Sequence, residues 1–344
     1  RHPSYLGDGS SVVCSSDLAS LLYLRRTEAA AAKAAEARAA AEAAEAQEEL
    51  VLAEGLLGWC RLLGGDVDEG LEGLRRTLEG ARAVEGGPWE GRYPGGTARA
   101  HSELAAALEL SGRLDEAHEV AVAGAATAAA QGVARTLGST LEARAARALY
   151  QLGRWDEAAA IARPALEAGA VGAGRILLLA CLALIDVARG RSEEAATTIA
   201  MAEGLVTERT PLDVRRWLTA AAMEHALWSG DPANALARLA LAADDTDAPA
   251  APGPGSRPAV LDASAPYLLA LGARACADAA RAERASGEET GVAALARTRV
   301  EDALERASAQ QALSGIWTAD LTLARAELAR AGDATPEERV ETWR

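Results

Sequence analysis

The chain has 344 residues, 50% of them hydrophobic, and a formal net charge of −15 from 35 basic and 50 acidic residues. This acidic balance argues against binding to nucleic acid phosphates or to anionic membrane surfaces, because both attract basic faces. Aromatic residues make up only 3% and Phe is absent, so alanine-rich helices that each bury little area must be stabilised by many contacts between neighbours.

The first part of the chain divides into a foreign segment and a helix. Residues 1–18 resemble the read-through of a sequencing adapter, most closely from Val13 to Leu18, and we exclude them from the fold. Residues 19–53 are expected to form one long Ala/Glu-rich helix with strong helical propensity and little to bury. This helix would be solvated and would cap the helices that follow. A coiled coil is disfavoured because the a and d positions lack Leu and Ile.

A short turn motif recurs five times in the next part of the chain. Each copy has a glycine, then a polar stretch, then an Ala or Gly that opens an apolar helix. The copies are GDVDEG from Gly65, GRLDEA from Gly112, GRWDEA from Gly153, GRSEEA from Gly190 and GDPANA from Gly230. They are separated by about 40 residues, a period that is typical of stacked helical hairpins.

Each part of the motif has a physical reason. Glycine just past a helix end can adopt the left-handed conformation that satisfies the last carbonyl groups. Acidic residues behind it lie in the first turn of the next helix, where the helix dipole favours negative charge. The small residues Ala117, Ala158, Ala195 and Ala235 would then let the second helix approach the first closely.

The sequence therefore predicts an all-α fold, specifically an α-solenoid of antiparallel helical hairpins with tetratricopeptide-like repeats. About five hairpins are expected within residues 47–243, at 47–84, 97–132, 138–169, 174–207 and 212–243. A Pro/Gly-rich loop is expected at 86–96. Residues 244–259 are expected to form a flexible linker. The region 260–344 would add helices at 260–284, 290–310 and 315–331, with a last helix from Pro336 cut short at the C-terminus.

Motifs for catalysis are missing from the sequence. A phosphate loop needs a lysine directly after a glycine, and the single lysine, Lys33, has no glycine in the residues just before it. The four cysteines form no CxxC pair and are expected to be buried apolar groups or free thiols. His101 and His118 fit ordinary polar positions better than a metal site, and Trp155, Trp217 and Trp228 fit a core. We expect no enzyme activity, no cofactor and no metal.

The predicted array does offer a binding surface. In tetratricopeptide hairpins the first helix of each pair lines the concave face. The residues that would face inward are Arg99, Ser102, Thr140, Arg147, Trp217 and Glu224. A groove and a plain solvent-facing surface explain them equally well. Candidate partners are a protein or peptide, a small-molecule effector, or a neighbouring domain of the same protein.

Three runs carry a resemblance to a known family. They are LAAALELSGRLDEA from Leu104 to Ala117, GVARTLG from Gly132 to Gly138, and ALYQLGRWDEA from Ala148 to Ala158. These runs resemble the helical-repeat region of large ATP-binding LuxR-type transcriptional regulators, over about residues 50–344. Such proteins place the array between an ATPase and a helix-turn-helix. The sequence departs from the family at Arg144, where relatives tend to have asparagine.

The resemblance implies a non-catalytic sensor and scaffold that binds an effector or protein and restrains an adjacent ATPase. On this interpretation the chain is a fragment that lacks the ATPase and the DNA-binding domain, and it makes no contact with nucleic acid itself. The alternatives are a free-standing tetratricopeptide adaptor that binds a partner peptide, or the repeat region of an ATPase-linked nucleotide cyclase. Without a signal peptide or a long apolar run, we expect a cytoplasmic protein with no membrane contact.

Overall fold

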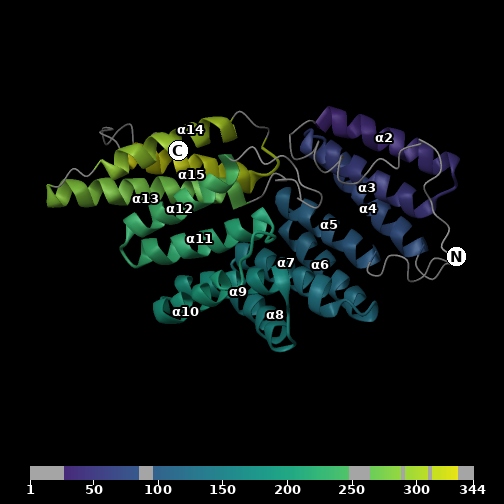
Figure 1. Ribbon diagram of the computed structural model, residues 1–344, viewed down its shortest axis with the longest axis horizontal. Coiled ribbons are helices and arrows are strands. Elements are labelled where there is room, and N and C mark those ends of the chain that lie inside the picture. Colours follow the sequence, from purple (N-terminus) through teal and green to yellow (C-terminus); the bar gives the residue numbers. More distant parts are fainter. Residues whose placement is uncertain (1–26, 85–95, 248–263, 288–290, 309–311, 332–344) are drawn as a thin grey trace. The chain divides into compact units, whose positions relative to one another are not determined.

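The computed structural model describes residues 27–84, 96–247, 264–287, 291–308 and 312–331 (Figure 1). Every regular element in these ranges is helical, so the predicted all-α class is confirmed for them. The predictions for residues 1–18, for the loop up to residue 95, for residues 248–259 and for the helix from Pro336 lie outside the described residues. None of the helices described between residues 27 and 331 combines the length and apolar character needed to cross a membrane.

The described chain falls into two compact units. The first contains α2 (Thr27–Ala43), α3 (Gln47–Leu63) and α4 (Val67–Val84). In α2, Ala30 and Ala34 are fully buried, and Ala30 packs into a small cluster with Cys60. Glycine brings α3 and α4 together, because a Cβ on Gly70 would lie only 2.6 Å from the Cβ of Leu62.

The single helix expected over residues 19–53 is a wrong prediction. α2 ends at Ala43 and α3 begins at Gln47, with Glu45 between them at a φ of 53°. The amide of Ala46 donates to the carbonyl of Ala41 at 2.9 Å, which closes the end of α2. Glu45 thus adopts the left-handed conformation that glycine adopts at the other turns. Without a glycine as a signal, the sequence shows no break here.

The second unit contains the remaining helices. They are α5 (Gly96–Leu110), α6 (Leu114–Ala130), a π-helical turn η1 (Ala134–Gly138), α7 (Ser139–Gln151), α8 (Trp155–Glu167), α9 (Gly172–Ala188), α10 (Ser192–Glu203), α11 (Leu212–Trp228), α12 (Pro232–Asp247), α13 (Ser264–Ser286), α14 (Val292–Ser308) and α15 (Gly315–Ala331). α12 continues through Asp247, so the first four residues of the expected linker 244–259 are helical.

Packing in the second unit follows a simple rule. Each helix contacts the next one along the chain, and each odd-numbered helix from α5 to α13 also contacts the following odd-numbered helix. An apolar cluster lies on α7 to α11 and includes Leu149, Leu178 and Ile185. The odd-numbered helices therefore share one continuous run of contacts, and we call their mutually facing side chains the odd-helix layer.

The recurring turns all close by the same hydrogen bonds. At Gly153, with φ of 75°, the amide donates to Tyr150 at 3.0 Å, and the next amide, of Arg154, donates back to Leu149 at 2.9 Å. Equivalent pairs of bonds close the turns at Gly65, Gly112, Gly190 and Gly230. This is the Schellman geometry, in which a left-handed residue lets two late amides reach the last helical carbonyls.

The small residues after these turns are buried as predicted. Ala117, Ala158, Ala195 and Ala235 are at most 1% exposed. Because a protein interior is close-packed, a larger side chain at these positions would push the two helices of a pair apart.

Turn geometry gives a first test of the fold. A Cβ at Gly153 would meet nothing within 4 Å, so Gly153→Ala isolates the cost of the left-handed backbone, about 1–2 kcal/mol. We expect urea unfolding of the purified chain to show a loss of that size. The reverse change, Glu45→Gly, should stabilise the first unit because it relieves the same strain.

Two substitutions control this test. Gly315 is the first residue of α15, where a Cβ would meet nothing within 4 Å and φ is not left-handed. Gly315→Ala should therefore leave the free energy of unfolding unchanged. Glu42→Gly, three residues before Glu45 and inside α2, should destabilise by about 1 kcal/mol. Equal losses of stability in Gly153→Ala and Gly315→Ala would show that the left-handed backbone is not the cause of the cost at Gly153.

Candidate binding site on the odd-helix layer

A buried ion cluster joins α5 to α7. Glu109 lies in the last turn of α5, and only 2% of its side chain is exposed. It accepts from Arg147 Nε at 2.9 Å and from Arg147 Nη2 at 2.5 Å, and from Arg144 Nη1 at 2.8 Å. Arg144 and Arg147 lie on one face of α7 because residues three apart are neighbours on a helix. One carboxylate therefore faces two guanidinium groups.

Trp217 extends this cluster from α7 to α11. The guanidinium carbon of Arg147 lies 4.9 Å from the centre of the Trp217 ring. The same indole packs against Tyr267 of α13, with ring centres 6.0 Å apart. Trp217 is only 5% exposed, yet its indole nitrogen has no acceptor among the described residues.

Glu224, two turns after Trp217 on α11, collects the next contacts. Its carboxylate accepts from the Tyr267 hydroxyl at 2.7 Å and from the Trp228 indole at 3.0 Å. Arg274 of α13 lies 3.8 Å from the Glu224 carboxylate and stacks over Trp228, 5.1 Å from the ring centre. These contacts fix α11 against α13.

The line of contacts ends between α13 and α15. Arg330 of α15 donates to Asp278 at 2.9 Å and to Glu327 of its own helix at 2.7 Å. Arg274 also lies 3.8 Å from Asp278. Charged or aromatic contacts thus connect α5, α7, α11, α13 and α15 in sequence.

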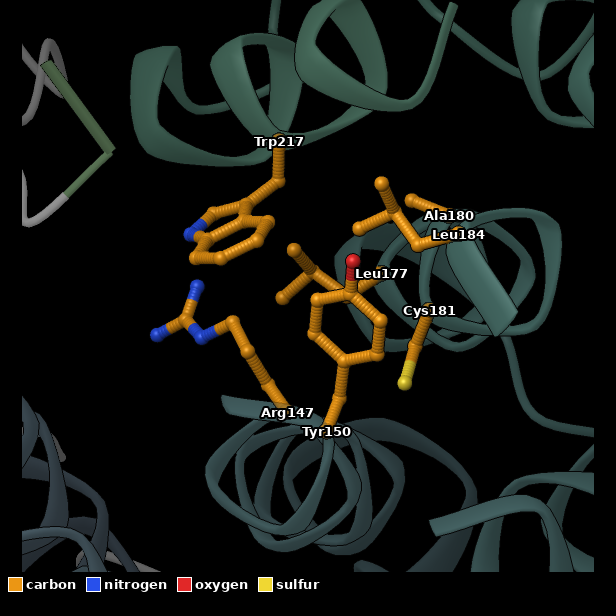
Figure 2. Close-up of a pocket in the computed structure, with 7 residues that line it drawn as sticks. All are labelled: Arg147, Tyr150, Leu177, Ala180, Cys181, Leu184 and Trp217. Atoms are coloured by element: carbon orange, nitrogen blue, oxygen red, sulfur yellow. The ribbon is translucent and has the colours of Figure 1, made fainter. Parts of the chain in front are cut away.

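A pocket opens beside this line, between α7, α9 and α11 (Figure 2). Its empty volume is about 200 Å³, part of it open to solvent. The lining residues are Arg147 and Tyr150 from α7, Leu177, Ala180, Cys181 and Leu184 from α9, and Trp217 from α11. In Figure 2 the Trp217 nitrogen lies at the end of the indole beside the Arg147 guanidinium, away from the Tyr150 hydroxyl.

The titratable groups on the other side of this pocket are held neutral. Burial, reinforced by the charge of Glu224, raises the pKa of Tyr150 to about 12, although a hydrogen bond with Tyr267 acts in the opposite direction. Burial also raises the pKa of the Cys181 thiol to about 12. At neutral pH the pocket therefore has one charged lining side chain, Arg147, beside two neutral polar groups.

The six residues predicted for a groove have different environments. Arg147, Trp217 and Glu224 belong to the line of contacts described above. Ser102 is 7% exposed within α5, and Thr140 donates to the carbonyl of Thr136 one turn back at 3.3 Å. Arg99 is exposed on α5. The structure thus brings three of the six together.

Sequence reasoning missed Glu109, Arg144, Tyr150, Tyr267 and Arg274. A usable signal exists, because the hydrogen-bonded pairs lie about one repeat apart: 35 and 38 residues for Glu109 with Arg144 and Arg147, and 43 for Glu224 with Tyr267. Searching for complementary side chains at that separation would have found them.

The predictions for tryptophan, cysteine and histidine had mixed outcomes. Trp217 is a core residue, but Trp228 is 67% exposed, so its assignment to the core is wrong. The predicted burial of cysteine holds for Cys60, Cys181 and Cys276, which are free thiols. His101 is 2% exposed and its Nδ1 lies 2.9 Å from the carbonyl of Thr97. The described residues contain no group of three side chains arranged to hold a metal.

Comparisons with known proteins give a structural likeness only. No family model matches the chain, and no curated protein matches it. It is similar to the crystal structure of BtubC (BKLC) from P. vanneervenii, with a TM-score of 0.49 and 21% sequence identity over 68% of this chain and 95% of that one. Independently of this likeness, the described residues define an all-helical protein whose helices pack neighbour to neighbour.

The buried ion cluster gives a second test. Glu109→Gln would leave two guanidinium groups without their carboxylate, so we expect a loss of about 3 kcal/mol in urea unfolding. The control is Glu301→Gln, which breaks the exposed Arg297–Glu301 pair at 2.7 Å on α14 and should cost less than about 1 kcal/mol. Equal losses would mean that burial of Glu109 has no energetic role.

Thiol reactivity gives a third test. Burial raises the pKa of Cys181 and Cys276 to about 12 and that of Cys60 to about 11, so the reactive thiolate is rare at pH 8. In a Cys14→Ser background, the native chain should react with a disulfide reagent at least about 100-fold more slowly than the urea-unfolded chain. Rapid labelling of the native chain would contradict the burial.

Proposed function

We propose that this chain is a non-catalytic sensor and scaffold, a tetratricopeptide-like α-solenoid region of a LuxR-type transcriptional regulator. It would bind an effector or protein on the odd-helix layer and restrain a neighbouring ATPase. One observation carries the proposal: a Schellman turn recurs about every 40 residues, and the odd-numbered helices pack in succession. Repeats of this kind present one helix of each pair as a shared binding surface.

Binding fits the polar groups of the odd-helix layer better than catalysis. Glu109, Glu224 and Asp278 all accept from guanidinium, indole or hydroxyl donors or lie beside arginine. A general base must be available to take a proton from a substrate. Carboxylates held this way instead fix the helices and shape the surface between them.

The line of contacts also suggests how binding would be transmitted. It connects α5, α7, α11, α13 and α15 in sequence, so a change in the packing of one pair would alter the contacts of the next. A ligand can shift such an equilibrium only when it binds one packing better than the other. An effector that touches two odd-numbered helices at once meets this condition. The role of an ATPase in the response rests on the resemblance to LuxR-type regulators.

The decisive experiment is to read the coding sequence on both sides of this chain with long genomic reads. We expect an upstream ATPase with a phosphate loop and a downstream helix-turn-helix. A reading frame that ends in stop signals on both sides would overturn the assignment to a LuxR-type regulator. It would favour the free-standing adaptor that binds a partner peptide. A cyclase domain next to the array would overturn the transcriptional output.

Purified protein provides the matching biochemical prediction. The chain alone should neither hydrolyse ATP nor retard DNA in a gel, because the proposal gives both activities to neighbouring domains. The control is the longer protein that contains the upstream domain, which should hydrolyse ATP. Hydrolysis or DNA binding by the isolated chain would contradict a purely sensory role.

A further inference from the structure

The odd-helix layer leaves little free space where α7, α9 and α11 meet. The enclosed part of the pocket between these helices holds only about one water molecule. Arg147 and Trp217, two of the residues predicted to line a groove, are 8% and 5% exposed. A partner of this layer therefore meets a surface that the chain's own side chains already fill.

Arg147 and Trp217 close the pocket from two helices that are not neighbours. In the succession of odd-numbered helices, α9 lies between α7 and α11. The two side chains point toward each other beside the side chains of α9 (Figure 2), and the guanidinium carbon lies 4.9 Å from the ring centre. Two hydrogen bonds anchor Arg147 on Glu109. The Trp217 indole nitrogen has no acceptor among the described residues, so the indole is held less firmly than the guanidinium.

The side chains behind this contact are apolar. Leu177, Ala180 and Leu184 of α9 line the pocket and are buried, and so does the Cys181 thiol beside them. Burial of apolar side chains is favourable. The contact between α7 and α11 therefore stabilises the closed layer by keeping water away from α9.

The closed arrangement also has a cost. The indole N–H of Trp217 has lost water and gained no acceptor, which destabilises this conformation. Water supplies an acceptor once the indole leaves the pocket. The cation–π attraction and the apolar burial oppose that movement. Opposing terms of this kind favour a small population in which one part of a domain is open while the rest stays folded.

We propose that the Arg147–Trp217 contact is a lid over the apolar side chains of α9, and that the second unit opens there while its other helices stay folded. A partner that binds the uncovered α9 side chains would hold the lid open, because it binds only that conformation. This regulatory role rests on the proposed sensor function. The opening itself does not, so it is measurable on the purified chain.

Two cysteines of the chain report on the opening. Cys181 lies behind the lid, and Cys276 lies in α13 outside the pocket lining. Both are buried, and burial raises the pKa of both thiols to about 12. The chain is treated with N-ethylmaleimide at increasing urea concentrations, and mass spectrometry of the digested protein measures the label on each cysteine.

We expect the two cysteines to become accessible by different routes. Cys181 should react at least about tenfold faster than Cys276, at a rate that low urea leaves unchanged, because a local opening exposes little surface. The rate at Cys276 should rise steeply with urea, since that thiol is exposed only when the second unit unfolds.

A matched pair of variants assigns the opening to the lid. Trp217→Ala removes the indole and its cation–π contact, and it should raise the ratio of Cys181 to Cys276 labelling by about tenfold. Trp317→Ala removes a tryptophan of similar burial, from α15 and outside the pocket lining, and should not raise this ratio. A general loss of stability accelerates both cysteines, so it does not imitate the expected result. Circular dichroism verifies that each variant is folded, and the urea series on the unaltered chain needs neither variant.

The outcomes are distinct. Faster labelling of Cys181 that low urea leaves unchanged, with a raised ratio only in Trp217→Ala, supports the lid. Equal or slower labelling of Cys181, or a dependence on urea as steep as that of Cys276, would overturn it. An equal rise of the ratio in both tryptophan variants would also overturn it, because the opening would not involve the lid. None of these results depends on the flanking domains, so the lid and the assignment to a LuxR-type regulator can fail separately.

Discussion

The structure depends on one backbone constraint, the left-handed residue that closes each recurring turn. It allows a helix to satisfy its last carbonyl groups within three residues and reverse direction. Where glycine provides this conformation, the next helix begins at once, and a small residue such as Ala158 packs against the preceding helix. Repetition of the turn sets the period, and the period decides which side chains of successive odd-numbered helices meet.

The line of contacts on the odd-numbered helices depends on that period. Glu109 meets Arg147 across one repeat, and Glu224 meets Tyr267 across another. A buried ion pair contributes little net stability because desolvation offsets the attraction, but it costs much when one partner is lost. Such pairs therefore specify the register of neighbouring helices.

Much of the fold could be read from the sequence, because glycine, first-turn acids and small residues each leave a local signal. The break at Glu45 could not be predicted, since nothing in its composition marks a left-handed residue. The candidate site was harder to predict from the sequence. Arg147, Trp217 and Glu224 followed from counting positions on a helix, whereas Glu109 and Tyr267 required knowing which helices touch. The exposed Trp228 was misplaced because Arg274 and Glu224 hold an aromatic ring at the surface without burying it.

The distance along the chain between contacting residues has a consequence for how the second unit acquires its structure. Pairs such as Glu109–Arg147 and Glu203–Arg238 join residues only 38 and 35 positions apart. A chain dominated by contacts of such short separation pays little loop-closure entropy before each contact forms. Folding can start at any adjacent pair of hairpins and extend in either direction. Ribosomal synthesis would then supply each new hairpin with a finished surface on which to pack.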